Sequence, residues 1–265
     1  MSAAIETRGL TRRFGALTAV DALSLGVEPG EVFGLLGPNG AGKTTTIKML
    51  ITLLPPTAGD ATVAGYDVIH EQRLVRRSIG YVPQLLSSDG ALSARENLEI
   101  SARLYHLPAP ERRERIADAL RFMGLEDVAD SLVRTFSGGM IRRLEIAQAM
   151  LHRPPVLFLD EPTVGLDPVA RRAVWEHVRR LRDLEGTTIL LTTHYMDEAS
   201  ELCERIGIMH LGKLAALGTP AELAAQVGTG ATLDDVFTHF TGSDLETGGT
   251  YRDVARTRRT ARRLG

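Results

Sequence analysis

One segment constrains this chain more than any other, the glycine-rich run Gly37-Pro38-Asn39-Gly40-Ala41-Gly42-Lys43-Thr44. It follows the apolar stretch Val32–Leu36 and opens the helix-prone stretch Lys43–Ile51. Glycines let a backbone curl until several N–H groups point at one anion, and a helix N-terminus adds the positive end of its dipole. A glycine-rich turn that binds nothing is the alternative, but a full match between strand and helix opposes it. The run therefore predicts a nucleoside triphosphate site, with Lys43 on the β- and γ-phosphates and Thr44 on Mg²⁺.

A second apolar run, Val156–Leu159, ends in the two acids Asp160 and Glu161. Ligands of open parallel sheets gather at the carboxyl ends of the strands, so these acids are expected beside the glycine-rich loop. Asp160 is suited to holding hydrated Mg²⁺, and Glu161 to polarising a water for in-line attack on the γ-phosphate. Taken alone, two acids in a solvated turn would be an equally good interpretation. The glycine-rich loop upstream favours the catalytic one.

Short apolar runs alternate with helical spacing through much of the chain and predict an α/β fold whose parallel sheet is buried on both faces. The predicted strands are Ile5–Leu10, Leu23–Val27, Val32–Leu36, Ile79–Val82, Val156–Leu159 and Thr187–Leu191, with a closing hairpin of Ile206–His210 and Lys213–Leu217. Helices are predicted over Lys43–Ile51 and Pro168–Leu184, and short ones over 220–227 and 232–240.

Residues 92 to 151 differ from their surroundings, because helical spacing continues there without a strand signal. Ser93–His106, Glu111–Met123 and Gly139–Leu151 predict three helices of an insertion within the α/β domain. The third is preceded by Ser137, Gly138 and Gly139. That trio is first of all a helix N-cap, and the same geometry also suits an anion. The chain thus offers a second candidate phosphate site, which lacks a lysine.

Composition excludes several classes of protein. The hydrophobic fraction of 43% and charged fraction of 24% are those of a globular chain, and the apolar runs fall short of the ~20 residues of a membrane-spanning helix. The single cysteine, Cys203, and the N-terminus without a signal-peptide pattern favour a cytoplasmic chain. The net charge is −2, but residues 248–265 carry six Arg and one Asp, and no broad basic face predicts nucleic acid as a partner.

The motifs follow one another in a recognisable order. Gln84 ends Tyr81-Val-Pro-Gln84, Phe136-Ser-Gly-Gly-Met140 precedes the acidic strand, and Val164-Gly-Leu-Asp167 and Leu191-Thr-Thr-His194 follow it. Over residues 5–217 the chain resembles the ATPase domains of ABC transporters. The resemblance implies a P-loop NTPase fold, with a RecA-like parallel core, an N-terminal antiparallel β-subdomain and an inserted helical subdomain. The expected division is 1–218 for the ATPase domain (insertion about 85–151), 219–242 for a C-terminal helical extension and 243–265 for a mobile Arg-rich tail.

The resemblance also implies roles for individual residues. Such domains work as head-to-tail homodimers, in which ATP bound by Gly37–Thr44 and Thr45 of one copy is covered by Ser137, Gly138 and Gly139 of the other. Glu161 would be the catalytic base, and Gln84 would sense Mg²⁺ and the attacking water. His194 would hydrogen-bond the γ-phosphate, and Asp167 would cross the dimer interface. Mg²⁺ would be held by Thr44, Gln84 and Asp160. Taken singly, Gln84, Asp167 and His194 are better explained as a polar turn residue, a helix cap and a polar strand end.

Three positions depart from the family pattern. Phe14 stands where the family usually places a tyrosine that stacks on adenine; its π-face is kept, and a core phenylalanine is the alternative. Phe136 and Met140 replace the customary leucine and glutamine on either side of Ser137-Gly-Gly. Because Glu161, Ser137 and the glycines are intact, ATPase activity is expected.

The resemblance implies a separate permease, contacted through residues around Gln84–Asn97, and a place at the cytoplasmic face of the membrane. Thr232–Gly242 resembles the C-terminal region of the daunorubicin-resistance type of export ATPase, which favours export of a hydrophobic compound. The alternatives are an importer subunit and a non-transport ABC ATPase. A non-catalytic regulatory subunit is disfavoured by the intact Lys43, Glu161 and His194.

Overall fold

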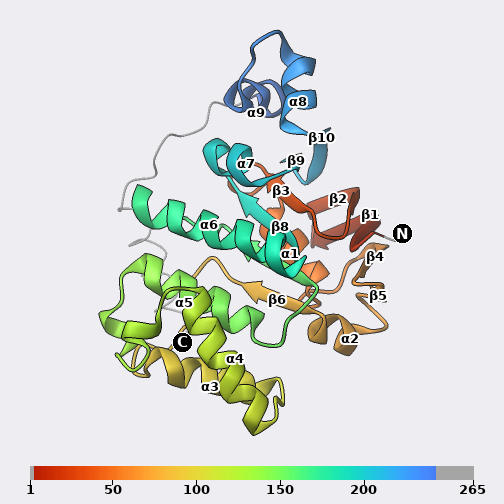
Figure 1. The fold of residues 1–265 in the computed structure, drawn as a ribbon. Coiled ribbons are helices and arrows are strands. Elements are labelled where there is room, and N and C mark those ends of the chain that lie inside the picture. The colour runs from red at the N-terminus through yellow and green to blue at the C-terminus, as the bar shows by residue number, and fades with distance from the viewer. Residues whose placement is uncertain (1–2, 243–265) are drawn as a thin grey trace.

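The computed structural model of the chain describes residues 3–242, which form two β-sheets with helices packed around them (Figure 1). In chain order the elements are β1 (Ile5–Phe14), β2 (Leu17–Val27), β3 (Val32–Leu36), α1 (Lys43–Leu50), β4 (Ala58–Val63), β5 (Tyr66–Asp67), α2 (Gln72–Arg77), β6 (Ile79–Val82), α3 (Ala94–Leu104), α4 (Ala109–Phe122), α5 (Gly138–Met150), β7 (Val156–Asp160), α6 (Pro168–Glu185), β8 (Thr188–Thr193), α7 (Met196–Leu202), β9 (Arg205–His210), β10 (Lys213–Gly218), α8 (Pro220–Val227) and α9 (Leu233–Thr241).

The larger sheet has the strand order β10-β9-β3-β8-β7-β6, and only β10 runs antiparallel to its neighbour. Alternate side chains of β3 enter different cores. Val32 and Leu36 pack with the α5–α6–α7 layer, whereas Phe33 and Leu35 pack with α1 and the smaller sheet. The expected α/β fold, with a parallel sheet buried on both faces, is therefore confirmed.

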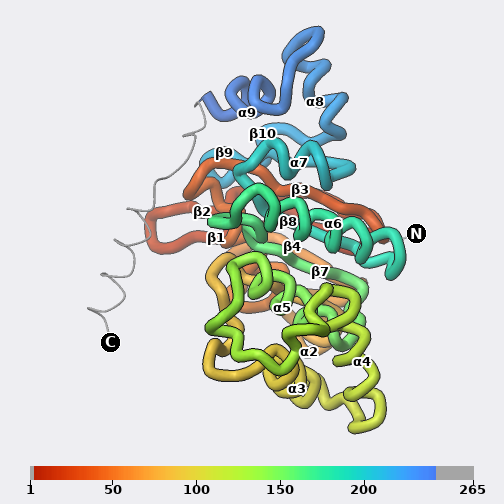
Figure 2. The backbone as a smooth tube through the Cα atoms, turned by 60° about the vertical axis from the view of Figure 1, so that its left-hand side comes forward, coloured from red at the N-terminus to blue at the C-terminus, as the bar shows by residue number. Residues whose placement is uncertain are grey.

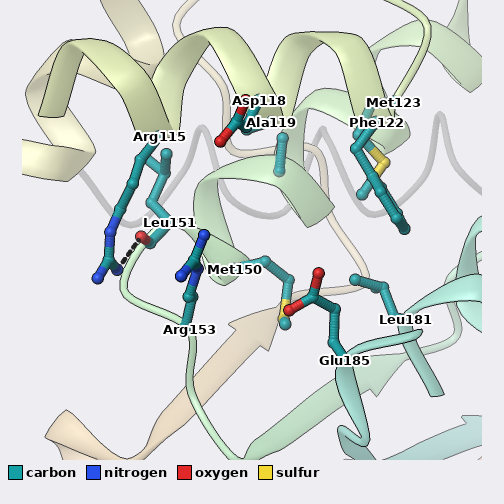
Figure 3. A pocket seen from close by; sticks show the side chains of 11 residues that line it. Arg115, Asp118, Ala119, Phe122, Met123, Met150, Leu151, Arg153, Leu181 and Glu185 are labelled. Atoms are coloured by element: carbon teal, nitrogen blue, oxygen red, sulfur yellow. Dashed lines mark hydrogen bonds between the residues drawn. The ribbon is translucent and has the colours of Figure 1, made fainter. Parts of the chain in front are cut away.

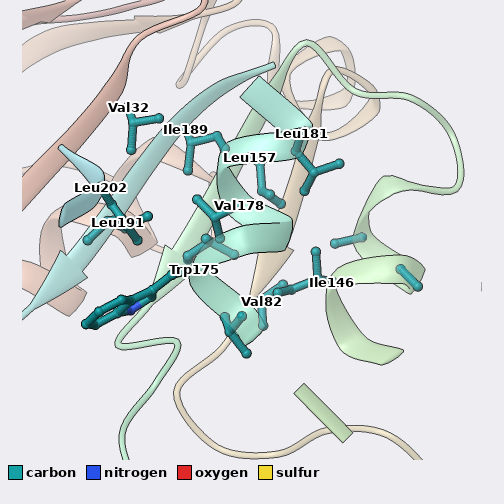
Figure 4. Packing of buried hydrophobic residues seen from close by; sticks show 14 of the residues in the cluster. Val32, Val82, Ile146, Leu157, Trp175, Val178, Leu181, Ile189, Leu191 and Leu202 are labelled. Carbon is teal, nitrogen blue, oxygen red and sulfur yellow. The ribbon is translucent and has the colours of Figure 1, made fainter. Parts of the chain in front are cut away.

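Helix α6 covers one face of this sheet (Figure 4). Asp167 caps its first turn and Gly186, in the left-handed conformation, ends it. Trp175, Val178 and Leu181 lie along its buried side and meet the strand residues Leu157, Ile189 and Leu191. The apolar stripe at i, i+3 and i+6 is what fits an α-helix onto a sheet.

The other face is covered by α1 and by the antiparallel sheet β2-β1-β4-β5. Two of its strands are longer than predicted, because β1 runs on to Phe14 and β2 starts at Leu17. The register between them shifts at three places, which breaks the alternation that the strand prediction relied on. The sequence did not predict β4, since Gly59 and Asp60 are residues that disfavour strands, yet β4 pairs with β1 on both sides of a register shift at Gly59.

Helices α3, α4 and α5 form one end of the molecule in both views, and α8 and α9 form the other (Figures 1 and 2). Capping boxes at Ser93, Thr219 and Thr232 begin α3, α8 and α9, whereas α4 begins after Pro108 without a side-chain cap. The predicted domain limits remain predictions, and the predicted mobile tail lies outside the described residues. Within the described part of the chain, no helix has both the length and the apolar character that crossing a bilayer requires.

Candidate active site

The glycine-rich loop joins β3 to α1 and curls around the ammonium of Lys43. Lys43 Nζ donates to the carbonyl oxygens of Gly37 (2.7 Å) and Pro38 (3.3 Å). At two positions of the loop only glycine fits, because any side chain would collide with a neighbouring backbone carbonyl. A Cβ at Gly37 would lie 2.5 Å from the carbonyl oxygen of Met209. One at Gly42, where φ is +106°, would lie 2.5 Å from that of Ala19. The loop is thus wedged between strands that hold its backbone in shape.

Glu161 is the point on which the predicted catalytic side chains converge. Its Oε1 lies 3.3 Å from Lys43 Nζ, and its Oε2 accepts a hydrogen bond from Gln84 Nε2 at 3.0 Å. His194 Nδ1 lies 3.4 Å from the same Oε2. Side chains from the start of α1, from the segment after β6 and from the residue after β8 therefore meet at one carboxylate, which directly follows β7 beside the loop.

Electrostatics in this cluster keep the carboxylate charged. Burial alone would raise the pKa of Glu161, but the nearby His194 ring and the charge of Lys43 outweigh it and hold that pKa below its ordinary value. Burial lowers the pKa of Lys43, against the opposing effect of Glu161. Glu161 is only 5% exposed, so its charge acts in a poorly hydrated place.

The backbone of Glu161 is also unusual, with φ of +50°, a region that non-glycine residues rarely occupy. Its N–H donates to both the carbonyl oxygen (3.1 Å) and the side-chain oxygen (3.0 Å) of Thr192 on β8. The hydroxyl of Thr192 in turn donates to Asp160 Oδ1 at 2.6 Å. Thr192 therefore orients both acids. It was missed from the sequence, although it stands within the Leu191-Thr-Thr-His194 motif.

Asp160 and Thr44 provide the oxygen atoms that Mg²⁺ prefers. Thr44 Oγ1 donates to Asp160 Oδ1 at 3.2 Å, and Asp160 is almost fully buried. Among the described residues, no three His, Cys, Asp or Glu side chains form a metal site by themselves. The Thr44 and Asp160 oxygens fit Mg²⁺, which is held by one or two protein oxygens together with phosphate oxygens and water.

A cleft of about 410 Å³ opens in front of this cluster. Its lining combines the loop with residues of β1, β2 and the two catalytic segments: Phe14, Leu17, Ala19, Asn39, Gly40, Ala41, Gly42, Lys43, Thr44, Thr45, Gln84 and Glu161. Phe14 is 45% exposed, which excludes the alternative of a core phenylalanine. The guanidinium of Arg12 lies over its ring, 4.6 Å from the centroid. The ring is therefore held at the mouth of the cleft.

The second candidate phosphate site lies elsewhere. The Ser137 hydroxyl accepts the Met140 N–H at 3.3 Å and caps α5, while Asp167 Oδ1 accepts the Val169 and Ala170 N–H groups at 2.9 Å and caps α6. None of the Ser137–Gly139 trio is among the described residues that line the cleft. Within one chain, Ser137 and Asp167 therefore act as helix caps. The interface roles of these residues stay predictions.

A smaller pocket, of about 230 Å³, lies between α4, α5 and α6 (Figure 3). Its floor is apolar, and its rim carries Arg115, Asp118, Arg153 and Glu185. None of the predicted site residues is among the described residues that line it.

Comparison with known proteins agrees with this geometry. Residues 20–164 match the model of the ABC transporter family. The daunorubicin/doxorubicin resistance ATP-binding protein DrrA of Streptomyces peucetius is 49% identical over 226 residues, which are 85% of this chain and 68% of DrrA. The linearmycin resistance ATP-binding protein LnrL of Bacillus subtilis is 41% identical over 84% of this chain and 72% of LnrL.

Two solved structures share the fold. The ATP-binding subunit of an ABC transporter superimposes with a TM-score of 0.80 at 33% identity, over 89% of this chain and 99% of that one. The ATP-binding cassette MJ0796, solved as a dimer in a post-hydrolysis state with ADP and Pi, has a TM-score of 0.72 at 26% identity. It covers 81% of this chain and 98% of its own.

Proposed function

The chain belongs to the ABC transporter family, and from that premise we propose that two copies hydrolyse ATP head to tail to drive export through a separate permease. The observation that carries the proposal is the convergence of Lys43, Gln84 and His194 on the Glu161 carboxylate. An ionised carboxylate beside a phosphate-binding loop is the arrangement that water attack on a γ-phosphate needs.

The contacts around Lys43 suggest how ATP engages the site. Lys43 bonds two loop carbonyls and Glu161, which are partners that phosphate oxygens can replace. Once the ammonium turns to the β- and γ-phosphates, the Glu161 carboxylate is available to accept a proton from water. Gln84 and His194 then fix the direction of that carboxylate and contact the water and the γ-phosphate. Phe14 stacks on the adenine.

Thr44 and Asp160 are the residues that would hold Mg²⁺, with Gln84 completing the set through its amide oxygen. When bound, Mg²⁺ neutralises charge on the β- and γ-phosphates. Within the chain, Thr192 keeps Asp160 oriented for this purpose through its 2.6 Å hydrogen bond.

A second copy would complete the site. The lining of the cleft includes Phe14 and Glu161, and within the described residues it includes none of the Ser137–Gly139 trio. The N–H groups and dipole end of α5 suit a γ-phosphate, so we assign this trio to the ATP bound by the partner. The dimeric MJ0796 structure with ADP and Pi supports the arrangement.

The permease and its cargo are inferred from the surface and the relatives. Leu85 and Leu86, directly after Gln84, are 81% and 51% exposed, which suits an apolar contact with a membrane protein at the cytoplasmic face. The drug-resistance names of the relatives, and the Nod factor export protein of Paraburkholderia xenovorans at 45% identity, favour export over import. We propose a hydrophobic, drug-like cargo.

The direct test is Glu161→Gln in the full chain. We expect ATP turnover to be lost while ATP and Mg²⁺ convert the variant into a stable dimer, detected by light scattering. The matched control is Glu31→Gln. Glu31 is also 5% exposed, but it directly precedes β3, at the end of that strand away from the glycine-rich loop, and it pairs with Arg205. A Glu161→Gln variant that hydrolyses ATP at the parent rate would refute the assignment of the base.

A further inference from the structure

Helix α5 carries a buried charge pair outside the residues assigned above. Arg142 and Glu145 are both 2% exposed at the side chain, and Arg142 Nη1 lies 3.0 Å from Glu145 Oε2. Charges are rarely buried in a protein interior unless they are paired and hydrogen-bonded. The pair stands one turn apart on the helix that Ser137 caps.

Both members of the pair hold the loop that contains Gln84. The guanidinium of Arg142 donates to the carbonyl oxygens of Pro83 (2.7 Å) and Gln84 (2.9 Å). Glu145 Oε1 accepts hydrogen bonds from the N–H and the hydroxyl (3.1 Å) of Ser87. Arg142 therefore binds the backbone carbonyls at the start of the loop, and Glu145 binds polar groups a few residues further on.

Further contacts on the same helix face extend this grip. Ser88 N–H donates to Glu145 Oε1 at 3.3 Å, and the Ser88 hydroxyl donates to Gln148 Oε1 at 2.8 Å. Between these fixed ends, the Gln84 side chain reaches Glu161 at 3.0 Å. The backbone of the loop is thus attached to α5, whereas the Gln84 side chain points into the active site.

Helix α5 therefore joins two parts of the ATP site. Arg142 and Glu145 lie five and eight residues after Ser137, which is about 8 to 12 Å along a rigid helix. If α5 shifts when its N-terminus meets a phosphate, the backbone of the Gln84 loop must move with it, because the hydrogen bonds of Arg142 and Glu145 fix the loop to the helix.

We propose that the Arg142–Glu145 pair is a positioning device, which sets the Gln84 carboxamide against Glu161 and makes it follow the movement of α5. The inference rests on the proposed function, because it assigns to the pair the coupling of one copy's signature trio to its own catalytic carboxylate. Neither residue is among the described residues that line the cleft of the proposed ATP site. Both act through Gln84.

The experiment compares Arg142→Gln with Arg143→Gln in the full chain. Arg143 is the adjacent arginine of α5 and also donates to backbone carbonyls, those of Met123 and Gly124, but these end α4 rather than the Gln84 loop. We expect Arg142→Gln to lower kcat about 10- to 100-fold, since a displacement of about 1 Å at a reacting group has effects up to that size. The KM and the Kd for ATP stay within about twofold, because the nucleotide contacts lie in the glycine-rich loop. Arg143→Gln keeps kcat.

A second variant and a second measurement guard against simple unfolding. Arg142→Lys keeps the charge beside Glu145 but replaces the planar fork with a single ammonium, so we expect it to melt at a higher temperature than Arg142→Gln while kcat still falls. Amide hydrogen exchange at Ser87 and Ser88 is expected to accelerate in both Arg142 variants.

The outcomes separate cleanly. A parent chain that does not bind ATP would overturn the proposed function and the inference with it. A parent that binds and hydrolyses ATP, together with an Arg142→Gln variant of equal kcat, would overturn the positioning role alone. Equal losses in kcat for Arg142→Gln and Arg143→Gln would show that Arg142 only stabilises the fold. That result would also overturn the positioning role.

Discussion

Thr192→Val tests how the core orients the two acids of the active site. Thr192 is fully buried on β8, and its hydroxyl donates to Asp160 Oδ1 at 2.6 Å and accepts the Glu161 N–H at 3.0 Å. Valine has nearly the same shape but can neither donate nor accept. The substitution therefore removes two hydrogen bonds and disturbs little of the packing.

The magnitude follows from those two bonds. A hydrogen bond to a charged group contributes about 1.5–3 kcal/mol and a neutral one about 1 kcal/mol, so the free energy of unfolding is expected to fall by about 2.5–4 kcal/mol. Glu161 has φ of +50°, a conformation that costs on the order of 1–3 kcal/mol and persists only while its surroundings hold it. Loosening it displaces the carboxylate, and we expect kcat to fall about 10- to 100-fold.

The assay is urea unfolding and steady-state ATP turnover, with Thr188→Val as the matched control. Thr188 lies on the same strand, about 13 Å away, and its hydroxyl accepts the Gly30 N–H at 2.9 Å. The control is expected to lose about 1 kcal/mol of stability and to keep the parent kcat. A Thr192→Val variant with kcat within twofold of the parent would refute the reasoning. An equal loss of turnover in the control would refute it too.

Two further predictions concern the edge of the cleft and the acid stability of the fold. Phe14→Ala is expected to weaken ATP binding about tenfold, the size of a lost stacking contact, whereas Phe14→Tyr binds ATP like the parent; equal Kd values for all three would remove the stacking role. Burial, aided by the charges of Arg143 and Arg180, lowers the pKa of His177 to about 4. Because the folded pKa lies below the ordinary value of 6.5, the stabilisation is present above pH 6.5 and is lost as the pH falls toward 4. The free energy of unfolding is expected to drop by about 2 kcal/mol between pH 7 and 5 on account of His177. His177→Asn, measured by urea unfolding at both pH values, is expected to remove that part of the drop, and an unchanged drop would contradict the assignment.

Local patterns were enough to predict the parts of the fold that alternate regularly. The buried strands and the helix from Pro168 have strong periods and clear end signals, so their limits were predicted to within a few residues. β4 was not predicted, because Gly59 and Asp60 disfavour strands, and pairing with β1 overrides that local preference. The register shifts between β1 and β2 likewise come from tertiary pairing.

The candidate site shows the same division. Residues within the motifs, such as Lys43, Gln84 and Glu161, could be predicted because the motifs state their chemistry. Thr192 and the Arg142–Glu145 pair could not be, because their importance lies in which atoms the fold brings next to them. One signal was available for the pair: two opposite charges stand three residues apart on one helix, with Ile141, Leu144 and Ile146 beside them.

The central claim is that each ATP is shared between two copies of the chain, and mixing two inactive variants tests it most directly. Lys43→Ala removes the phosphate contact from one copy. Ser137→Asp keeps an N-cap on α5 but places a negative charge where the partner's γ-phosphate would lie. Each variant alone is expected to be inactive. In an equal mixture half of the dimers pair the two variants, and each such dimer has one intact site, so turnover is expected to recover to about a quarter of the parent value. A mixture no more active than the two variants measured separately would contradict the shared site.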